Sequence, residues 1–118
     1  MFEEIMMAAA GESWYAVRCV FRWEASGGPL YEERLTLWLA GSMDEAIGRA
    51  EAEARRYAGE NGLQYLELAQ SYRLAADGRP GDGDEVFSLL RESRLDGEAY
   101  LDRYFDTGQE RQDCTGGP

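Results

Sequence analysis

Alternating apolar and polar positions dominate the first third of the chain. Residues 14–23 read WYAVRCVFRW, and a period of two is typical of a β-strand with two different faces. One predicted face is apolar and is expected to line the core: Tyr15, Val17, Cys19, Phe21 and Trp23. The other face mixes aromatic, small and basic side chains: Trp14, Ala16, Arg18, Val20 and Arg22.

The same alternation returns in residues 31–40, YEERLTLWLA. Leu35, Leu37 and Leu39 are expected to face the core, and the opposite side carries Glu32, Arg34, Thr36 and Trp38. The segment EASGGPL between the two strands predicts a hairpin loop a few residues longer than the tightest type. A register with Trp23 opposite Tyr31 pairs Cys19 with Leu35, so apolar side chains face one another.

Residues 42–62 carry the clearest helical pattern in the chain. Ser42 followed three residues later by Glu45 predicts a capping box, and Gly62 is a suitable terminator. The predicted buried stripe is mostly alanine, which lets a helix lie close to a sheet. Its members are Ala46, Ile47, Ala50, Ala54, Tyr57 and Ala58.

Two further strands and a short helix are expected after this helix. A third strand is predicted in residues 64–75, with Leu66, Leu68, Tyr72 and Leu74 on one face and Tyr65, Glu67, Ser71 and Arg73 on the other. The Gly-, Pro- and Asp-rich loop that follows leads into a fourth strand, EVFSLLRES, over residues 85–93. Asp96 is expected to cap a helix that ends near Gly108 and carries an apolar stripe of Tyr100, Leu101, Tyr104 and Phe105.

The order of these elements predicts an α+β fold. A right-handed crossover favours a four-stranded antiparallel sheet (ββαββα) with strand order 2-1-3-4 and helices packed on one face. With 118 residues, the chain has the usual size of one domain. We expect a flexible N-terminal arm over residues 1–12, a single domain over 13–108 and a disordered tail over 109–118.

Charge narrows the range of partners. The chain has 23 acidic and 12 basic residues, and its net charge of −11 repels phosphate backbones and anionic lipids. We therefore expect neither nucleic acid nor membrane as a partner.

Cys19, in a predicted strand, and Cys114, in the tail, do not suggest a disulfide framework. The N-terminus lacks the positive charge of a signal peptide, so a cytoplasmic location is expected.

The residue types needed for common catalytic sites are scarce. Histidine is absent, which removes the commonest general base and the commonest transition-metal ligand. The acidic loop residues Asp77, Asp82, Asp84 and Glu85 lack the spacing of an EF-hand. We therefore expect no enzymatic activity, no catalytic residue, no cofactor and no metal. A small-molecule site between sheet and helices is the least favoured class.

Several short motifs, taken in order, carry a family resemblance. WYAVR at residue 14, YEERLTLW at residue 31, EVFSLLR at residue 85 and YLDRYFDTG at residue 100 follow one another along the chain. In this respect the chain resembles a family of small bacterial proteins known only as a domain of unknown function (DUF4288-like). The resemblance implies a bacterial origin and a single autonomous domain. It brings no activity, cofactor or catalytic residue to these positions.

The face of the predicted sheet opposite the core is the candidate binding surface. Tryptophan and arginine are enriched at protein interfaces, and this predicted Trp/Arg face contains Trp14, Arg18, Arg22, Arg34, Trp38 and Arg73. It predicts a non-enzymatic interaction module that binds a protein partner or a second copy of itself. The same side chains could instead pair among themselves, or the C-terminal helix could cover them. A different function is that of an immunity-type acidic antagonist of a basic toxin or nuclease, acting through the acidic helix and loops.

Overall fold

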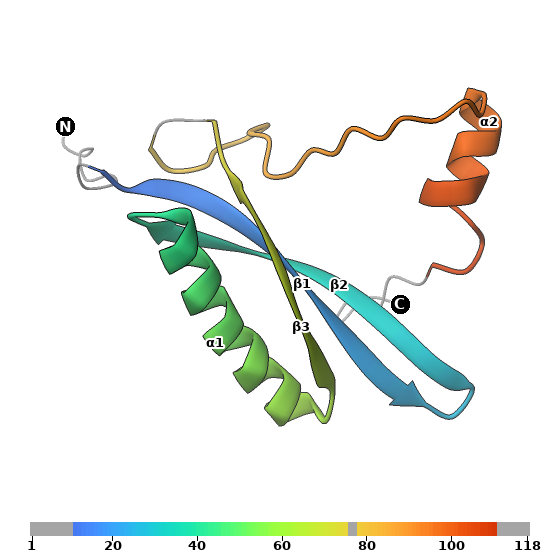
Figure 1. The fold of residues 1–118 in the computed structure, drawn as a ribbon, viewed down its shortest axis with the longest axis horizontal. Helices are drawn as coiled ribbons and strands as arrows, with labels where there is room; N and C mark the ends of the chain where they lie inside the picture. Colours follow the sequence, from blue (N-terminus) through green and yellow to red (C-terminus); the bar gives the residue numbers. More distant parts are fainter. Residues whose placement is uncertain (1–10, 76–77, 111–118) are drawn as a thin grey trace. The chain divides into compact units, whose positions relative to one another are not determined.

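The computed structural model describes residues 11–75 and 78–110 and divides the chain into two units, residues 1–88 and 89–118. The first unit contains β1 (Ser13–Ala25), β2 (Gly28–Ala40), α1 (Met43–Asn61) and β3 (Gln64–Arg73). The strands form a three-stranded antiparallel sheet in the order β2-β1-β3, and α1 packs along one face of it (Figure 1). The predicted four-stranded sheet in the order 2-1-3-4 is therefore wrong.

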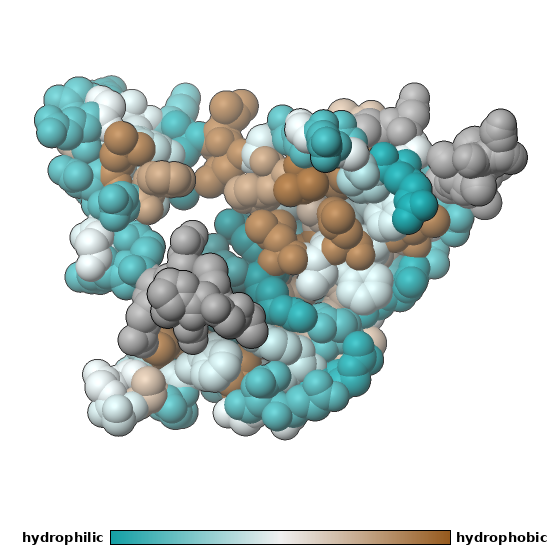
Figure 2. Space-filling model, turned by 180° about the vertical axis from the view of Figure 1, so that it is seen from behind, coloured by the Kyte–Doolittle hydropathy of each residue, from teal (hydrophilic) through white to brown (hydrophobic). Residues whose placement is uncertain are grey.

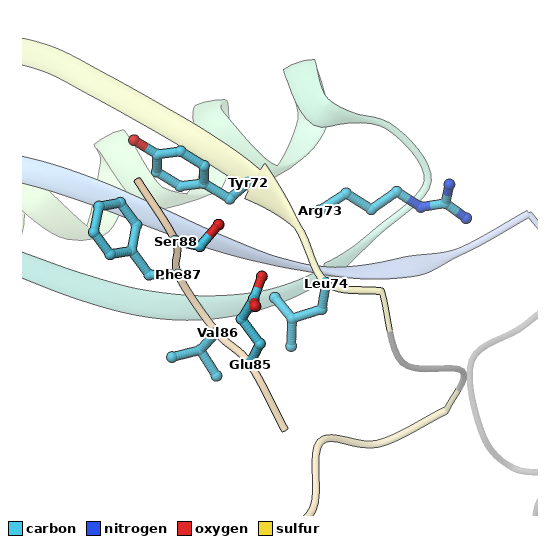
Figure 3. Close-up of a pocket in the computed structure, with 7 residues that line it drawn as sticks. All are labelled: Tyr72, Arg73, Leu74, Glu85, Val86, Phe87 and Ser88. Atoms are coloured by element: carbon cyan, nitrogen blue, oxygen red, sulfur yellow. The ribbon is translucent and has the colours of Figure 1, made fainter. Parts of the chain in front are cut away.

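The segment predicted as the fourth strand lies on the sheet and not in it. Residues 85–88 cross the side of the sheet away from α1, and the part of the chain described here has no strand between residues 85 and 93 (Figure 3). Phe87 packs edge-on against Tyr72 with ring centres 4.8 Å apart, and the Arg18 guanidinium lies 5.1 Å from the Phe87 ring centre. Glu67 has a left-handed backbone (φ 60°), which makes β3 an irregular template for another strand.

The hairpin between β1 and β2 has the tightest possible loop. Ala25 pairs with Gly28, which leaves Ser26 and Gly27 as the two turn residues. Trp23 consequently pairs with Leu30, and the predicted register with Tyr31 opposite Trp23 is wrong by one residue. Because side chains alternate with a period of two, this difference moves every β2 side chain to the other face of the sheet.

The predictions for α1 are confirmed at both ends. The Ser42 hydroxyl accepts a hydrogen bond from the Glu45 amide at 3.0 Å, and the Glu45 carboxylate accepts one from the Gly41 amide at 2.8 Å. Gly62 adopts the left-handed conformation (φ 70°) that ends the helix. The residues of α1 buried against the sheet are Ala46, Ala50, Ala54 and Ala58.

The core lies between α1 and the face of the sheet that α1 covers, here called the inner face. Val17 and Phe21 of β1 have no exposed surface. The Phe21 ring meets Tyr57 of α1 edge-on at 5.1 Å and Tyr65 of β3 at 5.5 Å. The predicted apolar face of β1 is therefore the core face.

The faces predicted for β3 are exchanged on both sides of a bulge, which adds two residues and so leaves the alternation of side chains unchanged. Ala69 pairs with Cys19 and Tyr65 pairs with Phe21, so four residues of β3 advance over two of β1. Tyr65, predicted on the non-core face, is buried at 6% exposure, whereas Leu68, predicted in the core, is 53% exposed. Tyr72 pairs with Ala16 and therefore lies on the side away from α1.

The second unit contains a short helix and no buried residue among those described. The Asp96 carboxylate accepts a hydrogen bond from the Ala99 amide at 2.9 Å and caps α2 (Gly97–Tyr100), as predicted. The helix continues as a π-helical turn over Leu101–Phe105. None of the helices in the described part of the chain has the length and apolar character needed to cross a bilayer. Most of the predicted N-terminal arm and C-terminal tail lies outside the described residues.

Candidate interaction surface

The six residues of the predicted Trp/Arg face are divided between the two sides of the sheet. Trp14, Arg18 and Arg22 lie on the side away from α1, here called the outer face. Arg34 pairs with Cys19, Trp38 pairs with Tyr15 and Arg73 also pairs with Tyr15, so these three lie on the inner-face side. The prediction that all six share one surface is wrong, because the tight hairpin exchanges the two faces of β2 and because β3 turns toward α1 the face predicted to point away from the core.

Arg34 is fixed beneath α1 by a two-pronged ion pair. Its Nη1 and Nη2 atoms lie 2.7 and 2.9 Å from the two carboxylate oxygens of Glu53. Its guanidinium carbon also lies 3.9 Å from the centre of the Tyr57 ring. The hydrogen bonds from Arg34 hold the pKa of Glu53 below its ordinary value, despite the opposing effect of burial. Arg34 therefore joins β2 to α1 and is not available to a partner.

Glu32 forms a second polar cluster at the same border of the core. Its carboxylate accepts hydrogen bonds from the Tyr57 hydroxyl at 2.9 Å and from the Trp23 indole at 3.0 Å. Burial, and then the hydrogen bond to Glu32, raise the pKa of Tyr57. Because the tight hairpin exchanges the two faces of β2, the charged residues Glu32 and Arg34 lie next to the core, and each forms hydrogen bonds there.

Trp38 and Arg73 also have partners within the first unit. The Trp38 indole donates to the Thr36 hydroxyl at 2.7 Å, and the guanidinium of Arg49 from α1 lies 5.2 Å from the Trp38 ring. Arg73 Nε donates to the Ser13 hydroxyl at 3.0 Å. These contacts make Trp38 a packing residue of the core border, while Arg73 links the ends of two strands.

The buried thiol of Cys19 is not arranged for chemistry. Desolvation by burial raises the pKa of Cys19, which keeps the sulfur protonated and poorly nucleophilic. Its neighbour Tyr65 donates a 2.6 Å hydrogen bond to Glu51, and burial together with that bond raises the pKa of Tyr65. The described residues contain no group of three or more cysteine, aspartate or glutamate side chains placed to hold a metal ion.

The outer face carries a row of leucines that the sequence pattern assigned to the core. Leu35 pairs with Arg18, Leu37 with Ala16 and Leu39 with Trp14, so all three leucines lie opposite outer-face residues of β1. Leu35 is 43% exposed and Leu37 is 42% exposed. Apolar side chains gather in one area of the surface seen in Figure 2. We call Leu35, Leu37 and Leu39 the leucine row.

Two arginines, each paired with a glutamate, lie on the same face as the leucine row. Arg18 contacts Glu33 at 3.4 Å and Gln70 at 2.5 Å, and Arg22 contacts Glu24 at 2.7 Å. The side chains of Glu33 and Glu24 are 63% and 73% exposed, so both ion pairs are weak. Arg18 itself is only 24% exposed and lies against Phe87, whereas Arg22 is 37% exposed and can exchange Glu24 for a contact with another molecule. The outer face therefore offers the apolar area of the leucine row and, nearer the hairpin, the accessible guanidinium group of Arg22.

A small hollow lies where the end of β3 meets residues 85–88 (Figure 3). Its volume is about 160 Å³, below the roughly 300 Å³ at which small-molecule sites begin. Tyr72 and Phe87 pack against each other at its border, and Glu85 is its only acidic side chain. It lacks the size and the converging polar groups of a ligand site.

Trp14 is less accessible than its place in the predicted surface suggests. Its indole nitrogen has no exposed area and no hydrogen-bond acceptor among the described residues. Ala16, on the same face, is 1% exposed. Part of the outer face is therefore covered, and the accessible part lies along β2.

Sequence reasoning missed the leucine row as a surface feature because it read alternating leucines as core. One signal could have located it: Ser26–Gly27–Gly28–Pro29 allows a two-residue turn, and a two-residue turn places Leu35 opposite Arg18.

Comparisons with family models, curated proteins and solved structures gave no match to this chain. The resemblance to the bacterial domain family stays a prediction.

Proposed function

We propose that the protein is a non-enzymatic interaction module that binds a protein partner through the outer face of its sheet. The observation that carries this proposal is the exposure of Leu35 and Leu37, at 43% and 42%, on a face with no helix over it among the described residues of the first unit. Exposed apolar side chains that lie together mark interaction sites more often than scattered ones do.

The chemistry of the outer face indicates the kind of partner that fits it. The leucine row supplies apolar area, and Arg22, which pairs with Tyr31 farther along the same face, supplies a guanidinium group in a weak, exposed ion pair with Glu24. A complementary surface has an apolar ridge with a carboxylate at one end, which can replace Glu24 as the partner of Arg22.

The geometry favours the outer face over the acidic surface of α1. Glu51 and Glu53 of α1 are hydrogen-bonded to Tyr65 and Arg34, and Arg49, Arg55 and Arg56 reduce the negative charge of the helix. An antagonist acting through this helix therefore has fewer free carboxylates than the sequence suggested. We do not propose that function.

Photo-crosslinking from single positions tests the proposal. A benzoylphenylalanine placed at Leu35 or Leu37 should crosslink to one partner in cells that make the protein. The same group placed at Leu68, which is 53% exposed but lies in the β3 bulge, is the matched control. The crosslinked partner is then purified and its affinity for the protein measured by calorimetry.

The expected result is crosslinking at Leu35 and Leu37 but not at Leu68, at a partner site that combines apolar and acidic residues. Leu35→Ser with Leu37→Ser should then weaken binding at least tenfold, while Leu30→Ser with Leu68→Ser should not. Equal crosslinking at all three positions, or unchanged affinity of the leucine-row variant, contradicts the proposal.

A further inference from the structure

Pro29 shows which way the backbone groups of β2 point. In an antiparallel pair, residues that exchange hydrogen bonds alternate with residues that do not. Pro29 pairs with Glu24 but has no N–H, so its pair is of the second kind. Pairs of the second kind recur at every second residue after Pro29. The residues whose N–H and C=O groups point away from β1 are therefore Tyr31, Glu33, Leu35, Leu37 and Leu39.

A side-chain contact supports this assignment independently. Arg49 Nη1 donates a hydrogen bond to the backbone carbonyl of Leu39 at 2.6 Å. That carbonyl therefore faces outward, as the counting from Pro29 requires. Among the described residues no strand pairs with this outer edge of β2, so Leu35 and Leu37 present backbone donors and acceptors without a strand partner.

The two edges of the sheet differ in regularity. β3 has a register shift and a left-handed residue at Glu67, devices that make an edge a poor template for pairing. β2 pairs with β1 in unbroken register from Gly28 to Ala40. A long, regular edge with exposed leucines is the kind to which another strand adds.

We propose that β2 of one copy pairs antiparallel with β2 of a second copy, about a two-fold axis at Thr36. Leu35 then exchanges two backbone hydrogen bonds with the partner's Leu37, and Leu37 exchanges two with the partner's Leu35. The product is a continuous sheet in which the two leucine rows meet on the outer face. This inference rests on the β2 edge and does not depend on the proposed function.

A second copy fits this edge because the central pairing segment is uncharged. Thr36 meets its own copy across the axis, a favourable cross-strand pair, and leucine meets leucine on either side. Glu33 falls opposite the partner's Leu39, so carboxylates do not meet across the seam. An edge that pairs antiparallel with itself forms a closed two-fold dimer and leaves no β2 edge for further growth.

The net charge of each copy predicts how salt acts on this dimer. Two molecules of charge −11 repel each other, and salt screens that repulsion over a Debye length of about 8 Å at physiological ionic strength. Self-association should therefore strengthen as salt is raised from 50 to 500 mM. An association based on opposite charges should weaken.

Sedimentation equilibrium and amide hydrogen exchange on the full chain test the proposal. Raising the protein concentration should convert monomer to dimer and slow the exchange of the Leu35 and Leu37 amides at least tenfold. Leu37→Pro removes an outward N–H that β1 does not use and should abolish the dimer. Leu37→Ala, the matched control, shortens the side chain but keeps the N–H, and should still dimerise.

Three results overturn the proposal. The first is a monomer at every concentration and salt. The second is a dimer in which the Leu35 and Leu37 amides exchange as fast as in the monomer. The third is a dimer lost equally in Leu37→Ala and Leu37→Pro, since that pattern indicates contact through side chains alone. If Leu37→Pro fails to fold, the amide hydrogen exchange of Leu35 and Leu37 in the unaltered protein still shows whether β2 pairs with a second copy.

Discussion

Replacing Arg34 by alanine tests whether β2 turns its polar side chains toward α1. The side chains of Arg34 and Glu53 are only 28% and 18% exposed, and they form two hydrogen bonds. Hydrogen bonds to charged groups contribute about 1.5–3 kcal/mol, and a cation–π contact such as that with Tyr57 contributes about 0.5–2 kcal/mol. After a reduction for partial solvent exposure, Arg34→Ala should lower the free energy of unfolding by about 2–3 kcal/mol.

Arg22→Ala is the matched control for this change. Arg22 lies on the outer face, and its ion pair with Glu24 is 37% and 73% exposed, so the loss should be below about 1 kcal/mol. Urea denaturation of both variants gives the two free energies. For a unit of this size, each kcal/mol corresponds to about 4–8 °C in the melting temperature, so thermal melting checks the difference independently. Equal stability of Arg34→Ala and Arg22→Ala refutes the placement of Arg34 beneath α1.

Other changes test the core, the helix cap and the ion pair. Phe21→Ala, at a site with no exposed surface, should destabilise by about 3–5 kcal/mol in urea denaturation, and a loss below 1 kcal/mol contradicts the described core. Ser42→Ala should cost about 1 kcal/mol, whereas Ser42→Asp, which keeps the cap, should restore most of it. Because Arg34 lowers the pKa of Glu53, that pair stabilises the fold above the unfolded glutamate pKa of about 4.3 and is lost as the pH falls through the lower folded value. Glu53→Gln should therefore flatten the fall in unfolding free energy in acid, and an unchanged pH profile refutes the role of the pair.

The elements with strong local signals could be predicted from the sequence. The ends of α1 follow from Ser42, Glu45 and Gly62, because caps and terminators act within one turn of the helix. The apolar face of β1 follows from alternation, and Val17 and Phe21 are indeed buried.

The candidate surface could not be predicted because it depends on register. One residue in the hairpin loop decides whether Leu35 or Arg34 faces α1, and residue patterning favoured the leucine. The observed arrangement, in which Arg34 faces α1, is stabilised by contacts between residues far apart in the sequence, such as Arg34 with Glu53 and Glu32 with Tyr57. The fourth strand was predicted wrongly for a similar reason, because Phe87 finds its partners Tyr72 and Arg18 on the surface of the sheet and not at its edge.

Nuclear Overhauser contacts across the sheet test the orientation of β2 most directly. The Trp38 indole protons should show contacts to α1, where Arg49 lies against that ring, and the Leu35 and Leu37 methyl groups should show contacts to Arg18 and Ala16 of β1. Contacts from either leucine to the buried alanine methyls of α1 would contradict the account, because they place the leucine row in the core.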